Sequence, residues 1–80
     1  MNTRQAVADR IIALCRSRGI TPNALSYLAG MSQSTISGIL NNESKNPGIV
    51  TVKKLCDGLG ITLPEFFDTD DFRALEQELK

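Results

Sequence analysis

Histidine is absent from the 80 residues, which removes the side chain best suited to proton transfer near neutral pH and the commonest metal ligand. Only two cysteines are present, Cys15 and Cys56, and they lie too far apart in the sequence, with no other cysteine or histidine, to form a zinc site. No glycine-rich phosphate-binding loop occurs either. We therefore expect no enzyme activity, no catalytic residue, no metal and no cofactor.

Long apolar segments are also missing. The longest wholly apolar run, from Ile11 to Cys15, is far too short for a membrane span or the core of a signal peptide, and the first ten residues are polar. The sequence thus predicts a soluble protein located in the cytoplasm, with no membrane partner. Because Cys15 and Cys56 each fall within an apolar helical pattern, we expect both to be buried and reduced, with no disulfide between them.

The chain has no net charge, but its charges are unevenly distributed. Residues 1–64 carry seven basic and three acidic side chains, a balance of +4, whereas residues 65–80 carry two basic and six acidic ones, a balance of −4. Asp68, Asp70 and Asp71 could in principle hold a divalent cation, although a solvated acidic tail is the better interpretation. A basic body of this kind leaves nucleic acid open as a partner.

Apolar residues recur at helical spacing along the whole chain, and no segment alternates with the period of a strand. Hydroxyl side chains precede five of these segments as candidate N-caps: Thr3, Thr21, Ser32, Thr51 and Thr62. Glu65 completes a capping box with Thr62. The pattern therefore predicts an all-α chain of five helices.

The expected buried faces follow from the same spacing. They are Val7, Ile11, Leu14 and Cys15; Ala24, Leu25, Leu28 and Ala29; Ile36, Ile39 and Leu40; Val52, Leu55, Cys56 and Leu59; and Leu63, Phe66 and Phe67. Phe72, Leu75 and Leu79 could form one stripe of a sixth helix, which would either close the core or supply a dimer contact.

The second and third helices are both short and are joined by a tight turn at residues 30–32. Small residues before this turn and an apolar residue within it, here Ala29, Gly30 and Met31, suit the steep crossing of a helix-turn-helix. The outer face of the third helix is uncharged and rich in hydrogen-bonding groups that could approach base edges. By residue type alone, an ordinary amphipathic helix with a solvated face would look the same.

From about residue 20 to residue 67 the sequence resembles the Xre/Cro/C1-type helix-turn-helix domains of phage repressors and bacterial regulators. The residues that carry this resemblance are Leu25, Gly30, Ser32, Ile36, Ser37, Pro47, Leu55, Leu59, Gly60 and Leu63. The resemblance implies a compact five-helix bundle of the lambda-repressor-like DNA-binding type, with a possible short sixth C-terminal helix. We expect residues 1–68 to form the DNA-binding domain and residues 69–80 an acidic, helical tail.

The resemblance also implies site residues. The start and outer face of the third helix would read bases in the major groove, through Gln33, Ser34, Thr35, Ser37 and Gly38. Phosphates would be contacted from the start of the second helix and from the loop after the third, by Thr21, Asn23, Asn41, Asn42, Ser44 and Lys45.

Two departures from the family pattern affect this site. Pro22 stands where the family often has a glutamine that grips phosphate and supports the residue at the position of Gln33, so Asn23 must supply that support or it is absent. Leu40, Asn41 and Asn42 replace the common glutamate, arginine and glycine.

We expect a sequence-specific binder of double-stranded DNA that acts as a repressor-like transcriptional regulator, as a homodimer at least on DNA and without a small-molecule ligand. The alternative is a protein interaction module, such as an antitoxin-like or anti-repressor subunit. Steep weakening of binding with salt would distinguish the first role from an apolar protein interface.

Overall fold

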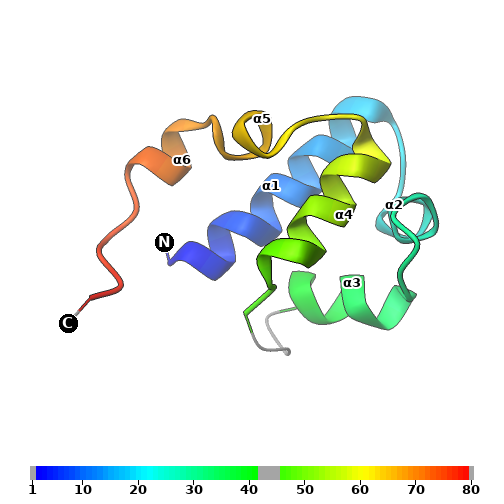
Figure 1. Cartoon of the computed structure of the whole chain (residues 1–80), viewed down its shortest axis with the longest axis horizontal. Helices are drawn as coiled ribbons and strands as arrows, with labels where there is room; N and C mark the ends of the chain where they lie inside the picture. The colour runs from blue at the N-terminus through cyan, green and yellow to red at the C-terminus, as the bar shows by residue number, and fades with distance from the viewer. Residues whose placement is uncertain (1, 42–45, 80) are drawn as a thin grey trace.

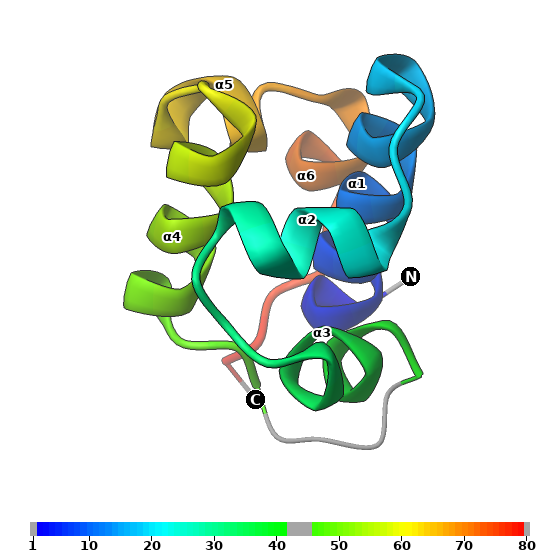
Figure 2. The same ribbon diagram turned by 90° about the vertical axis from the view of Figure 1, so that its right-hand side faces the viewer.

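The computed structural model describes residues 2–41 and 46–79, and within these residues the chain is entirely α-helical, as predicted. The helices are α1 (Thr3–Arg18), α2 (Pro22–Leu28), α3 (Gln33–Leu40), α4 (Ile49–Leu59), α5 (Leu63–Phe67) and α6 (Asp70–Arg73) (Figure 1). In Figure 2, α2 crosses in front of α1 and α4, with α3 below it. Because α2 packs against all three of these helices, it occupies the centre of the arrangement.

Three of the five predicted N-caps are confirmed. Thr21, Ser32 and Thr62 each accept a hydrogen bond from the backbone N–H three residues ahead, and Thr62 forms the predicted capping box with Glu65. Pro22 occupies the first turn of α2, where its missing N–H removes no helical hydrogen bond. The local signals at these helix starts therefore act as the sequence indicates.

The other two predicted caps are wrong. Asn2 caps α1 by accepting a 2.7 Å hydrogen bond from the Gln5 N–H, so Thr3 is already the first helical residue. Helix α4 begins three residues earlier than expected, after Gly48, whose extended backbone precedes a start without a side-chain cap. Thr51 consequently lies inside the first turn of α4.

The core is formed by the apolar faces of α1, α3, α4 and α5 around Leu25 of α2. Its fully buried side chains include Ile11, Leu25, Ile36, Leu55 and Phe66. Cys15 and Cys56 are both buried in this cluster as free thiols, which confirms the prediction for them.

Helix α2 differs from its predicted face. Leu28 is 58% exposed rather than inward, whereas Ser26 is buried and satisfies its hydroxyl by donating to the Asn23 carbonyl at 2.7 Å. The reason lies at Gly58 of α4, where a Cβ would lie 3.1 Å from backbone atoms of Leu28 and Ala29. The end of α2 thus rests on α4 through its backbone, which leaves the Leu28 side chain outside.

The predicted stripe of a sixth helix is also wrong in its extent. Helix α6 ends at Arg73, and Leu79 is 87% exposed. Phe72 packs edge-to-face on Phe67, with ring centroids 4.9 Å apart, and joins the edge of the core. One turn is sufficient to bury Phe72, so the residues after it have no apolar surface to follow as a helix.

Arg10 fastens the C-terminal part of the bundle to α1. Its guanidinium donates to the backbone carbonyls of Phe66 at 2.7 Å and Glu65 at 2.8 Å. These carbonyls belong to the last turn of α5, where no further helical N–H follows to satisfy them. Arg10 therefore acts as a side-chain cap supplied from another helix.

Candidate nucleic-acid interface

The turn between α2 and α3 is built by the residues that the sequence indicates. Gly30 has a φ of +67°, a conformation that glycine adopts without steric cost. The Met31 N–H donates to the Ser26 carbonyl at 3.0 Å, and the Met31 side chain packs against the core. The turn is therefore anchored at its centre, and this fixes the direction in which α3 leaves α2.

The first turn of α3 gathers three hydroxyl groups. The Ser32 hydroxyl accepts from the Thr35 N–H at 3.2 Å and lies 3.0 Å from the Ser34 hydroxyl and 2.9 Å from that of Thr35. Because each hydroxyl is both donor and acceptor, this small network can reorient toward a base or a phosphate without moving the backbone.

The predicted base-reading residues share one side of α3. Gln33, Ser34, Thr35 and Ser37 are exposed and Gly38 is half-buried, while Ile36 and Ile39 hold the opposite side in the core. The structure therefore brings the five residues together on an accessible surface. No charged side chain stands among them, so this surface can approach a groove edge by hydrogen bonding alone.

The predicted phosphate-contacting residues fall into two groups. Thr21 and Asn23 are exposed at the start of α2, where the Thr21 hydroxyl already accepts from the Ala24 N–H at 3.1 Å. Asn41 is exposed just after α3, whereas Asn42, Ser44 and Lys45 lie outside the described residues. The placed members thus lie at helix ends, where backbone groups are also available to phosphate.

Several cations are engaged with carboxylates elsewhere on the surface. Lys53 pairs with Asp57 along α4, and Arg73 pairs with both Asp68 and Asp70 around α6. Arg16 and Arg18, by contrast, are exposed in the last turn of α1, three to five residues before Thr21. Our sequence-based site did not include these two arginines, although their proximity in sequence to the cap of α2 is a signal that could have suggested them.

The described residues show no alternative kind of site. No group of three or more potential metal ligands comes together in residues 2–41 and 46–79. Burial raises the pKa of both the Cys15 and Cys56 thiols, which suppresses the reactive thiolate form. In this part of the chain, no helix combines the length and apolar character needed to cross a membrane.

Comparison with known proteins accounts for this geometry. The family model of the Cro/C1-type HTH DNA-binding domain matches residues 10–71, a stretch that includes α2, the turn and α3. The chain belongs to this family. The Cro/C1-type family is one of DNA-binding domains rather than of enzymes, so the exposed face of α3 belongs to a domain type whose role is DNA binding.

Three solved structures resemble the whole Cro/C1-type domain. The prophage Lp1 protein 11 is 33% identical, with 94% of this chain and 100% of that chain covered and a TM-score of 0.82. The restriction-modification controller protein C.Esp1396I is 25% identical, covering 94% and 95% of the two chains at a TM-score of 0.78. An HTH_3 family transcriptional regulator from Vibrio cholerae is 30% identical over 88% of this chain and 38% of its own, with a TM-score of 0.76. No curated protein matches. The chain is thus a DNA-binding regulator of the Cro/C1 type.

Proposed function

We propose that the chain regulates transcription as a repressor that binds a short, two-fold symmetric operator, with α3 in the major groove. The observation that supports this most strongly is the uncharged, exposed face of α3, held on the core by Ile36 and Ile39 behind a turn fixed at Gly30. The proposed role is binding rather than catalysis, and it is carried out in the cytoplasm.

Base reading is assigned to Gln33, Ser34, Thr35, Ser37 and Gly38. Gln33 is the first residue of α3 and is exposed, and a glutamine amide can form two hydrogen bonds with adenine. The hydroxyls of Ser34, Thr35 and Ser37 can donate or accept, and Gly38 permits close approach of the helix backbone. We expect Gln33 to make the most discriminating contact.

Phosphate contacts are assigned to Thr21, Asn23, Asn41, Asn42, Ser44 and Lys45. Such contacts set the register and orientation of the domain without reading sequence. Two of the exposed residues, Thr21 and Asn23, stand at the start of α2, where the helix dipole favours an anion. Arg16 and Arg18 would add long-range attraction at the same end of α2.

A homodimer on DNA is the second part of the proposal. Two recognition helices about 34 Å apart would read successive turns of the duplex, which compensates for the few cations of one domain. The tail no longer offers an apolar stripe for this contact, because Phe72 is absorbed by the core. We assign the contact to Ile49 and Val50, which are 60% and 65% exposed at the start of α4, directly after the loop that follows α3.

The base-reading assignment is tested by selecting sites from random DNA and titrating the preferred duplex with Gln33→Ala. We expect a loss of about 1 to 3 kcal/mol on the selected site and relaxed preference at one base pair. Gln77→Ala, an exposed glutamine in the tail, is the matched control and should bind normally. Lys45→Ala should weaken all sequences alike and reduce the salt slope by about one unit. Equal losses on selected and random DNA for Gln33→Ala would contradict the assignment.

The dimer is tested by sedimentation of the protein on a duplex carrying the selected site. We expect Ile49→Asp to bind as one protomer per site, because a charge at an apolar contact would remain without a partner. Tyr27→Asp, which adds the same charge at an 89% exposed position on α2, should still bind as two. The opposite result for this pair of variants would move the contact from α4 to α2.

A further inference from the structure

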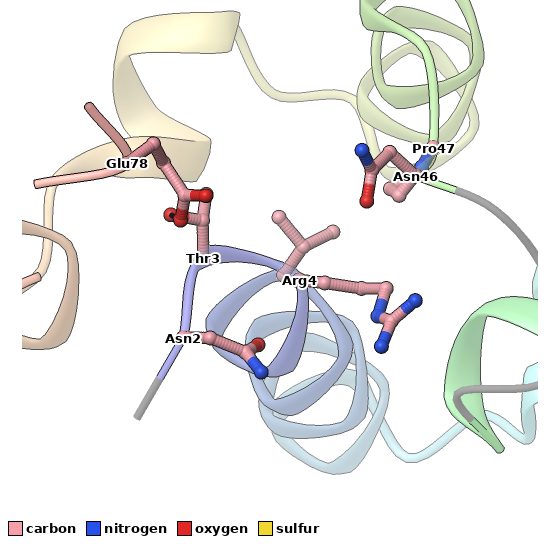
Figure 3. Close-up of a pocket in the computed structure, with 7 residues that line it drawn as sticks. Asn2, Thr3, Arg4, Asn46, Pro47 and Glu78 are labelled. Carbon is pink, nitrogen blue, oxygen red and sulfur yellow. Dashed lines mark hydrogen bonds between the residues drawn. The ribbon is translucent and has the colours of Figure 1, made fainter. Parts of the chain in front are cut away.

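The two ends of the described chain are joined by a hydrogen bond. The Thr3 hydroxyl, in the first turn of α1, donates to a carboxylate oxygen of Glu78 at 2.7 Å, across 75 positions in sequence. This bond forms one wall of a pocket of about 440 Å³ whose labelled lining residues are Asn2, Thr3, Arg4, Asn46, Pro47 and Glu78 (Figure 3). The tail after α6 is therefore seated on the bundle although it is not helical.

This pocket adjoins the proposed DNA-binding surface. Its second wall consists of Asn46 and Pro47, which directly follow the loop assigned to phosphate contact and precede α4. Helix α1, which supplies the floor, packs against α3. In Figure 3 the Arg4 side chain points away from Glu78, toward the side of Asn46 and Pro47. The carboxylate of Glu78 thus lies at the edge of the surface that would meet the DNA backbone.

The charge distribution gives this position a consequence. The tail from residue 65 onward has a balance of −4 against +4 for the body, and two of its carboxylates, those of Asp68 and Asp70, are already paired with Arg73. Glu78 instead reaches the start of α1, a helix of 16 residues whose N-terminal end carries partial positive charge. A DNA phosphate approaching Asn46 would encounter a carboxylate of the protein itself.

We propose that the tail is an autoinhibitory strap: Glu78, held by Thr3, keeps acidic residues beside the DNA-binding surface until the DNA backbone displaces them. The inference rests on the proposed DNA-binding role of the loop after α3. The hydrogen bond is exposed, so the strap is weak, and its release is worth about a two- to five-fold change in DNA affinity at low salt. Salt screens the carboxylate, so the effect shrinks as ionic strength rises.

The decisive experiment compares Glu78→Gln with Glu76→Gln in the full chain. Both variants remove one negative charge from an exposed position of the tail, but only Glu78 contacts α1 in this structure through a hydrogen bond to Thr3. Each is titrated with a fluorescent duplex at about 50 and about 200 mM salt. We expect Glu78→Gln to bind about two- to five-fold more tightly than wild type at the lower salt, with a smaller gain for Glu76→Gln and convergence at the higher salt.

Thr3→Val supplies an independent variant, because it removes the hydroxyl donor without changing any charge. We expect it to tighten binding in the same direction as Glu78→Gln, and we expect no further gain when the two are combined. Equal gains for Glu78→Gln and Glu76→Gln would show that only net charge matters and would overturn the strap. Unchanged or weaker binding by Glu78→Gln would also overturn it.

Failure of the strap and failure of the proposed function give different results. Wild-type protein that binds duplex DNA with a steep salt dependence, but shows no difference on Glu78→Gln, retains the function and loses the strap. If neither wild type nor variant binds duplex DNA at either salt concentration, the DNA-binding role fails and the strap fails with it. Binding by Glu78→Gln alone would support both.

Discussion

Replacing Gly58 by alanine should destabilise the protein although the position lies in the middle of a helix. In an open helix, alanine is favoured over glycine by about 1 kcal/mol. Here the new Cβ would lie 3.1 Å from the Ala29 nitrogen and the Leu28 carbonyl carbon, and 3.2 Å from the Ala29 Cα. All three are backbone atoms, so neither side can yield by rotating a side chain. Overpacking of this kind costs about 1 to 3 kcal/mol, which exceeds or cancels the gain in helix propensity.

We therefore expect Gly58→Ala to lower the free energy of unfolding by about 1 to 2 kcal/mol, and Tm by about 5 to 15 °C for a domain of this size. Circular dichroism during urea and thermal unfolding measures both. Gly48→Ala is the matched control, because its Cβ would meet nothing within 4 Å and its φ is −73°. Its stability should change by no more than about 0.5 kcal/mol.

The same substitution should also weaken DNA binding, because the end of α2 leads directly into the turn that orients α3. Titration of the selected duplex at a temperature where the variant is fully folded separates this effect from unfolding. A Gly58→Ala protein that is as stable as wild type would show that α2 and α4 can separate without cost. That result would refute the argument that their backbone contact fixes the geometry of the helix-turn-helix.

Three further predictions concern the bundle. Arg10→Met should lower the free energy of unfolding by about 1 to 3 kcal/mol in urea titrations, because two carbonyls at the end of α5 lose a charged donor; no change would show that water replaces it. Thr62→Ala should cost about 0.5 to 2 kcal/mol and Thr51→Ala much less, since only the former residue is a cap. Thiol reagents should label Cys15 and Cys56 slowly in the folded state and fully in denaturant, and rapid labelling would contradict their burial. Because burial raises the pKa of both thiols above 9.0, the unfolded chain releases these protons first, and stability measured by urea unfolding should fall as pH rises above about 9.

The sequence predicted helix starts well where one residue dominated the local choice. Thr21 is followed by proline and Thr62 is paired with Glu65, so each carries two signals at once. Thr3 had an equally good neighbour in Asn2, and Thr51 stood within an apolar run that could begin earlier. A cap is decided by where the chain enters the helix, and that entry depends on packing that local sequence does not contain.

The site residues were predictable as a surface because burial of Ile36 and Ile39 leaves only one outward face for α3. The tail was not predictable in the same way. Its apolar spacing fitted a longer helix, but the Phe66 and Phe67 rings provide a place for Phe72 alone. Contacts between distant segments, such as Arg10 with the end of α5, are set by tertiary geometry and leave no periodic signal.

The contact between Thr3 and Glu78 also makes the chain suitable for circular permutation. A short glycine linker could connect the two ends, and the chain could be reopened at the exposed turn around Gly19, which lies at the far end of α1, about 24 Å along that helix. The tail would then be a covalently closed loop over the start of α1. Such a permuted protein would fix the strap in place while leaving every side chain of the α3 face unchanged.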